Sequence, residues 1–135
     1  MRTGELLRHA AYIGRHQNKD FEWGKNDCLT FLFGWVDAVF GEKQQSKIRG
    51  KYYDIRSAVK FWREFPMSVK QWMTLRGFEQ TDGEYAREGD VRIIETAYPS
   101  AFIFHNGAWW QCSEGEGVKP YNLKWAKDFT HWRRT

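Results

Sequence analysis

The stretch NDCLTFLFGWVDAVFG, residues 26–41, places a long apolar run between a polar start and a glycine. Asn26 or Asp27 is suited to cap a helix, because a short polar side chain can accept hydrogen bonds from free backbone N–H groups. Gly41 is suited to end the helix, because glycine adopts the left-handed conformation without steric cost. The run is apolar on almost every face, so we expect a buried central helix from Cys28 to Phe40. Its apolar residues at helical spacing are Leu29, Leu32, Phe33, Val36 and Phe40.

Helical periodicity predicts three further helices around the central one. Their expected ranges are residues 5–16, about 54–65 and 69–76. Each follows a short polar residue that can serve as an N-cap. These candidate caps are Thr3, Asp54 and Ser68.

Segments rich in β-branched and aromatic residues follow a glycine-rich turn at residues 82–89. The expected strands are 89–95, 101–105 and 108–112. The HNG sequence between the last two favours a tight hairpin. A final strand or short helix is expected at about 121–132. Helices first and an antiparallel sheet afterwards predict one α+β domain over residues 1–135.

The composition limits the classes of protein to consider. The chain has 135 residues, which suits one domain, with 18% aromatic residues and eight tryptophans. Some of these large rings are expected at a groove or a protein contact. The formal net charge of +4 is scattered, without a recognisable nucleic-acid-binding module. No run approaches the about 18 apolar residues that span a membrane, and the N-terminus lacks signal-peptide features, so synthesis and folding in a cytoplasm are expected.

Cys28, the first of two cysteines, falls at the first turn of the expected central helix. Oriented N–H groups at a helix N-terminus favour a thiolate, so Cys28 is a candidate nucleophile that would need a base from another element. The alternative is an inert thiol packed in the core, which is also the interpretation of Cys112. A structural disulfide is not expected in a reducing compartment. The cysteine spacing does not match a metal site, and neither a metal nor a cofactor is expected.

Several short motifs carry a family resemblance. WGKNDCLTFLFGWV (residues 23–36) and REGDVRII (87–94), followed by an apolar hairpin, resemble the NlpC-type branch of papain-like cysteine peptidases. The whole chain resembles a family of small phage proteins of uncharacterised function that are encoded among tail genes. RGKY (49–52) and GF (77–78) contribute to this second likeness. The resemblance implies a papain-like fold, in which the cysteine-bearing helix packs on a small C-terminal antiparallel sheet.

The same resemblance implies roles for individual residues. Cys28 takes the position of the nucleophile, and Asp90 is a structural residue at the start of a strand. The histidine of active NlpC-type enzymes would fall at about residues 99–101, where the sequence is Pro-Ser-Ala. His105 lies four or five residues later, about 13–16 Å along a strand. Gln111 is the residue available as a third, orienting group.

Two hypotheses follow. In the first, the protein is a structural component of a phage tail, at the tail tip or baseplate, that has a peptidase-like fold without the acid–base machinery. Its expected partners are other tail proteins, it would be present in several copies, and its location is the virion. In the second, it is a cysteine amidase or endopeptidase that cuts peptidoglycan with Cys28 and His105. Residues expected to line a cleft or make contacts are Trp23, Asn26, Asp27, Trp109 and Trp110.

Overall fold

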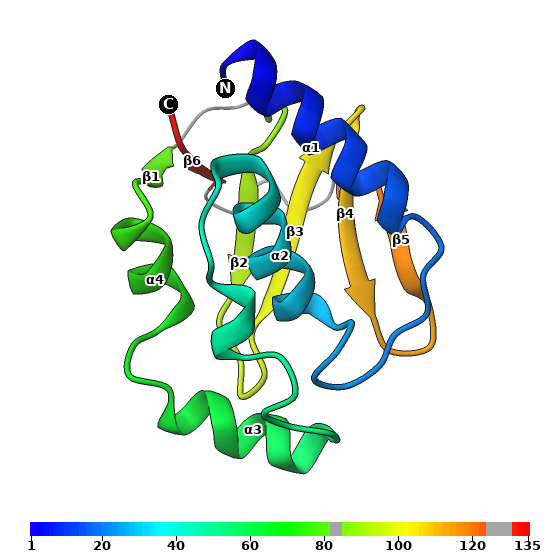
Figure 1. The fold of residues 1–135 in the computed structure, drawn as a ribbon, viewed down its shortest axis with the longest axis vertical. Helices are drawn as coiled ribbons and strands as arrows, with labels where there is room; N and C mark the ends of the chain where they lie inside the picture. The colour runs from blue at the N-terminus through cyan, green and yellow to red at the C-terminus, as the bar shows by residue number, and fades with distance from the viewer. Residues whose placement is uncertain (82–84, 124–130) are drawn as a thin grey trace.

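The computed structural model describes residues 1–81, 85–123 and 131–135. Figure 1 shows the helical N-terminal half of the chain and the strands that follow it. The helices are α1 (Thr3–His16), α2 (Cys28–Phe40), α3 (Ile55–Glu64) and α4 (Val69–Leu75), with a short 3₁₀ helix, η1, at Gln45–Lys47. The strands are β1 (Glu79–Thr81), β2 (Val91–Ile94), β3 (Ser100–His105), β4 (Ala108–Ser113), β5 (Gly117–Tyr121) and β6 (His131–Arg133).

The strands form one antiparallel sheet in the order β1-β6-β2-β3-β4-β5. Strands β2 to β5 are neighbours in sequence order, whereas β6 returns to lie between β1 and β2. Helices α1 and α2 lie together over one face of this sheet, with α2 against β3 and β4 (Figure 1). The predicted α+β class is therefore confirmed.

Helix α2 forms the centre of the hydrophobic core, as its sequence predicts. It begins at Cys28 and ends at Phe40, the two expected bounds. Asp27, rather than Asn26, is the N-cap, and its carboxylate accepts hydrogen bonds from the backbone N–H groups of Leu29 and Thr30. Gly41 ends the helix in the left-handed conformation, with φ of 72°. Ten of the thirteen residues of α2 are buried, from Cys28 to Val36 and Val39, so its stability comes from packing rather than from helix propensity alone.

The other predicted helices are also present, with one correction at a cap. Asp54 and Ser68 cap α3 and α4 by accepting hydrogen bonds from Ser57 N–H and Gln71 N–H. The expectation that Thr3 caps the first helix is wrong, because Thr3 is already helical and Arg2 is the N-cap. The carboxylate of Glu5 accepts the Arg2 backbone N–H at 2.8 Å, which satisfies this donor from within the first turn.

The three expected strands are confirmed as β2, β3 and β4, with small shifts at their ends. The hairpin between β3 and β4 turns at Asn106 and Gly107, which both have positive φ values of 50° and 79°. Strands β1 and β5 were not expected from the sequence. Of the final element expected at about 121–132, residues 124–130 lie outside the described part, and 131–132 belong to β6. Among the described residues, no helix is long and apolar enough to cross a membrane.

Candidate functional site

The thiol of Cys28 lies against the beginning of β3 and is held by three hydrogen bonds. Its sulfur accepts the backbone N–H of Ala101 at 3.3 Å and donates to the carbonyl oxygen of the same residue at 3.7 Å. The side-chain amide of Gln111, on β4, donates to the sulfur at 3.4 Å. The structure therefore brings Gln111 to Cys28, although the two residues are 83 positions apart.

Burial controls the ionisation of this thiol. Only 4% of Cys28 is exposed, and burial raises the pKa of its thiol to about 12, because a thiolate would lose its hydration. The hydrogen bond with Ala101 acts in the opposite direction, and the neighbouring Asp27 carboxylate raises the pKa further. Cys28 is therefore a neutral thiol at neutral pH.

The loop before α2 positions both Asp27 and Cys28. Besides capping α2, the Asp27 carboxylate accepts the backbone N–H of Gly24 at 2.8 Å. Gly24 has φ of 77°, and a Cβ at this position would lie 1.9 Å from the carbonyl oxygen of Tyr52. Only glycine fits this approach, so Gly24 allows the WG and RGKY segments to pack against each other.

The place where the family resemblance puts a catalytic histidine is occupied by the start of β3. Ala101 contacts the Cys28 sulfur directly, and Ser100 is a further polar neighbour that favours the ionised thiol. His105 is at the opposite end of β3, four residues after Ala101, which corresponds to about 13 Å along a strand. His105 therefore does not reach Cys28 and cannot act as its base in this arrangement.

The other three histidines have different partners. His9 contacts Trp35 and Glu88. His16 stacks on Tyr12 and donates to the Tyr12 carbonyl oxygen, and His131 accepts a hydrogen bond from Arg92. Among the described residues, which include all four histidines, no hydrogen bond joins a histidine to Cys28. The sulfur has polar neighbours but no base.

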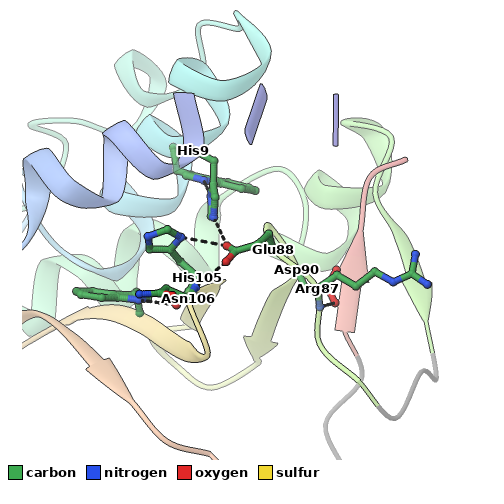
Figure 2. Close-up of polar contacts among 8 residues, drawn as sticks. His9, Arg87, Glu88, Asp90, His105 and Asn106 are labelled. Carbon is green, nitrogen blue, oxygen red and sulfur yellow. Dashed lines mark hydrogen bonds and ion pairs between the residues drawn. The ribbon is translucent and has the colours of Figure 1, made fainter. Parts of the chain in front are cut away.

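A second polar cluster lies at the other end of β3, around Glu88 (Figure 2). One carboxylate oxygen of Glu88 accepts hydrogen bonds from His9 Nε2 at 2.8 Å and His105 Nδ1 at 3.0 Å. The other oxygen accepts the backbone N–H of Asn106 at 2.7 Å. Glu88 thus connects α1, the segment before β2, and the β3–β4 turn.

Hydrogen bonding identifies the tautomer of His9 in this cluster. The indole N–H of Trp35 donates to His9 Nδ1 at 2.9 Å. Because indole nitrogen is only a donor, Nδ1 carries the lone pair and Nε2 carries the proton that Glu88 accepts. The nitrogen facing Glu88 therefore has no lone pair for a metal ion. Although His9, Glu88 and His105 place their ligand atoms within 4.8 Å of one another, this hydrogen-bonding pattern suits a structural clamp better than a metal centre.

Electrostatic effects in the Glu88 cluster follow from partial burial and hydrogen bonding. Burial acts to raise the pKa of the Glu88 carboxyl, but the hydrogen bonds from Asn106, His9 and His105 outweigh it and lower this pKa. Burial lowers the pKa of His9, against the opposing attraction of Glu88. The stable form is a neutral imidazole that donates to a carboxylate.

Asp90 holds a third polar cluster at the start of β2. Its fully buried carboxylate accepts the Arg87 backbone N–H at 2.8 Å and two hydrogen bonds from the Arg133 guanidinium at 2.7 and 2.8 Å. His131 Nδ1 lies 3.6 Å from the same carboxylate. Asp90 therefore joins the start of β2 to β6, near the C-terminus.

The candidate cleft residues mainly pack the interior. Trp110 is buried in the core cluster and donates its indole N–H to the His105 carbonyl oxygen. Trp109 is buried beneath the guanidinium of Arg92, which lies 4.2 Å from the ring centre. Trp23 is half-buried and packs edge-on against Tyr98. The side-chain amide of Asn26 donates a hydrogen bond to the Asp20 carbonyl oxygen. The backbone carbonyl oxygen of Asn26 accepts a hydrogen bond from the Cys112 thiol.

Sequence reasoning did not single out His9 or Glu88 as partners. They are 79 residues apart, and a lone histidine on a helix carries no local sign of its contact. The local signal nearest to them was the REGDV stretch, which contains Glu88 but drew attention to Asp90.

Fold and site together define an α+β protein whose central helix starts at a buried, hydrogen-bonded cysteine. The chain belongs to a family described as a domain of unknown function, DUF6950, whose model matches residues 5–130. That range contains the polar clusters around Cys28, Glu88 and Asp90, except for the β6 residues that contact Asp90. A comparison with curated proteins finds no match.

Proposed function

We propose that this protein is a structural component of a phage tail, at the tail tip or baseplate, with a papain-like fold that no longer supports hydrolysis. The tail role rests on the sequence resemblance to small proteins encoded among tail genes. The absence of hydrolysis rests on one observation, the surroundings of the Cys28 sulfur. Ala101, Gln111 and Ser100 are its polar neighbours, and no hydrogen bond joins it to any of the four histidines.

Two physical requirements of cysteine catalysis are unmet in this arrangement. The attacking species is a thiolate, but with a pKa of about 12 fewer than about one thiol in 1,000 is ionised at pH 7.5. A base within hydrogen-bonding reach would correct this by accepting the thiol proton. The polar groups beside the sulfur are a backbone amide, a carbonyl, a carboxamide and the Ser100 hydroxyl, and none of these accepts a proton at neutral pH.

A peptidoglycan assay tests the loss of hydrolysis. Purified wild-type protein and Cys28→Ser are incubated with purified peptidoglycan, and released fragments are separated and identified by mass spectrometry. We expect neither protein to release fragments, because Cys28 lacks a base. Release by the wild type alone would establish Cys28 as a nucleophile and overturn the proposal in favour of an amidase or endopeptidase.

Fractionation tests the tail role separately. In a phage that carries this gene, an epitope-tagged copy should sediment with isolated tails and be detected there by immunoblotting. Recovery of the tagged protein only in the fraction that does not sediment would contradict a structural role in the tail, whatever the peptidoglycan assay shows.

A further inference from the structure

Helix α3 carries three cationic side chains along one exposed face. Arg56, Lys60 and Arg63 are all exposed and occur at positions i, i+4 and i+7, which lie on the same side of an α-helix. At 1.5 Å per residue they span about 10 Å of the helix axis. The helix lies at the lower end of the molecule in Figure 1, and its opposite face buries Ala58 and Trp62.

These three cations form no ion pair within the described residues, although the Asp54 carboxyl, whose pKa is lowered by hydrogen bonds from Ser57 and by the charge of Arg56, lines the same hollow. No ion pair or hydrogen bond joins Arg56, Lys60 or Arg63 to another described group. The nearby Asp54 carboxylate already caps α3 by accepting Ser57 N–H at 2.8 Å. Some other arginines are paired, since Arg8 donates to the Val39 carbonyl oxygen and Arg133 to Asp90. Residues 53–64 also contain Asp54 and Glu64, so this segment keeps a net charge of +1, with its three cations on one face of α3.

Apolar side chains are exposed beside this charge. Tyr53 is 79% exposed and Ile55 is 51% exposed. Both line a surface hollow of about 670 Å³, and all three cations line the same hollow. Large apolar side chains and arginine in one patch are typical of protein–protein interfaces.

We propose that this α3 surface, defined by Tyr53, Ile55, Arg56, Lys60 and Arg63, binds an acidic segment of another protein. Charge complementarity identifies the class of partner, because three cations at helical spacing that form no ion pair within the described residues favour carboxylates. A protein partner also accounts for Ile55, whose aliphatic side chain can pack on apolar side chains but neither stacks on a base nor contacts a phosphate favourably.

The inference deepens the proposed structural role and rests on it for the partner being another protein. Its test measures binding, whereas the peptidoglycan assay measures bond cleavage and the fractionation measures location. A negative result in the binding test can therefore be distinguished from a negative result in the peptidoglycan assay or the fractionation.

The test uses a fluorescein-labelled peptide of about 14 residues made of Glu, Leu and Phe, and a matched peptide in which every Glu is Gln. Fluorescence anisotropy at low salt measures their binding to the wild type. We expect the Glu peptide to bind at least about tenfold more tightly than the Gln peptide, and this preference to shrink as salt screens the charges. In an NMR titration the perturbed amides should cluster at residues 53–63.

Two triple variants provide matched charge controls. Arg56→Glu/Lys60→Glu/Arg63→Glu reverses the α3 charges, and Arg15→Glu/Lys19→Glu/Lys43→Glu reverses three other exposed cations. Each changes the formal net charge by six, from +4 to −2. We expect the α3 variant to bind the Glu peptide at least about tenfold more weakly than the wild type, and the control variant to stay within about threefold. Circular dichroism checks that both are folded, and Arg56→Gln/Lys60→Gln/Arg63→Gln provides a milder change at the same positions.

Three outcomes would overturn the proposal. The first is no binding of the Glu peptide to the wild type at about 1 mM, which corresponds to about 4 kcal/mol of affinity. The second is an equal loss of binding in the two charge-reversal variants, which would show a response to net charge alone. The third is tighter binding of a single-stranded DNA oligonucleotide of similar length than of the Glu peptide, which would assign the surface to nucleic acid.

Discussion

Two opposing effects act on the Cys28 thiol, and burial is the stronger. A helix N-terminus stabilises a nearby negative charge by about 0.3–1 kcal/mol, and by up to about 2 kcal/mol in buried geometries. These energies lower a pKa by about 0.2 to 1.5 units. Burial instead raises the pKa of Cys28 from 9.0 to about 12. The position of a residue at a helix start therefore does not decide its reactivity when the site excludes water.

The first prediction concerns the chemical reactivity of Cys28. In the variant Cys112→Ser, which retains Cys28 as its only cysteine, iodoacetamide should modify the folded protein at least about 100-fold more slowly than the urea-unfolded protein near pH 7.5. The reason is that reaction requires both ionisation and exposure, and the folded structure limits both. Mass spectrometry of timed samples measures the rate. Comparable rates in the folded and unfolded proteins would contradict a buried, neutral thiol.

At the scale of elements, the Glu88 cluster attaches α1 to the sheet. His9 on α1 and His105 at the end of β3 both donate to the same Glu88 oxygen. This arrangement requires neutral His9 and ionised Glu88. Below pH 6.5, the unfolded chain protonates His9 before the folded protein does, because folding lowers the His9 pKa. At lower pH, protonation of Glu88 in turn removes the acceptor for these bonds.

Stability should therefore fall with acidification, and Glu88→Gln should remove the part of this dependence that comes from the carboxyl group below about pH 5. For His9, the lowered folded pKa means that stability is full above its unfolded value of 6.5 and decreases as the pH falls. For Glu88, stability is present above 4.5 and is lost as the pH falls through its lowered folded pKa. We expect Glu88→Gln to cost about 1–2 kcal/mol at neutral pH and to flatten the curve below about pH 5.

Urea unfolding at a series of pH values from about 7 to 4 measures both effects. Glu64→Gln is a suitable control, because Glu64 is exposed and has no hydrogen bond or ion pair among the described residues. If Glu88→Gln and Glu64→Gln showed the same pH dependence as the wild type, the Glu88 cluster would not contribute to the attachment of α1.

Local signals explain which elements the sequence predicts well. Helix α2 has a cap at Asp27, a left-handed stop at Gly41 and a long apolar run, and each of these acts within a few residues. Strand β1 has three residues, all exposed or half-buried, so neither its length nor its alternation stands out. It is a strand because it pairs with β6, where Gln80 faces Trp132. Such pairing depends on a segment about fifty residues away and leaves no local pattern.

At the scale of the whole molecule, the Asp90–Arg133 pair connects distant parts of the chain. Asp90 precedes β2, whereas Arg133 is the last residue of β6, and β6 lies between β1 and β2 in the sheet. The carboxylate is fully buried, so loss of its arginine would leave a desolvated charge with fewer partners. This pair therefore stabilises the position of the C-terminal strand.

We expect Arg133→Ala to destabilise the protein by about 2–4 kcal/mol, because breaking a buried pair leaves an uncompensated charge. Arg134→Ala is the matched control. Arg134 forms a 3.3 Å ion pair with Glu42 and lies 4.2 Å from the centre of the Phe40 ring, and its more exposed contacts are expected to contribute about 1 kcal/mol or less. Urea unfolding compares the two variants.

The double variant Asp90→Asn/Arg133→Ala separates loss of a contact from burial of an unpaired charge. Asn carries no charge, so the double variant leaves no unpaired charge in the interior. We therefore expect its loss of unfolding free energy to be smaller than the sum of the losses in Arg133→Ala and Asp90→Asn. Strict additivity of the two single changes would contradict direct coupling between Asp90 and Arg133.

The sequence by itself determined the α+β class, the four helices, the bounds of α2 and the β3–β4 hairpin, because caps, glycines and apolar periodicity act over a few residues. It also identified Cys28 as the candidate nucleophile. Only the tertiary structure decided how Cys28 is surrounded, how Glu88 gathers two histidines, and where β6 enters the sheet. These features depend on contacts between residues 17 to 83 positions apart, and their energies arise from burial, which no short stretch of sequence specifies.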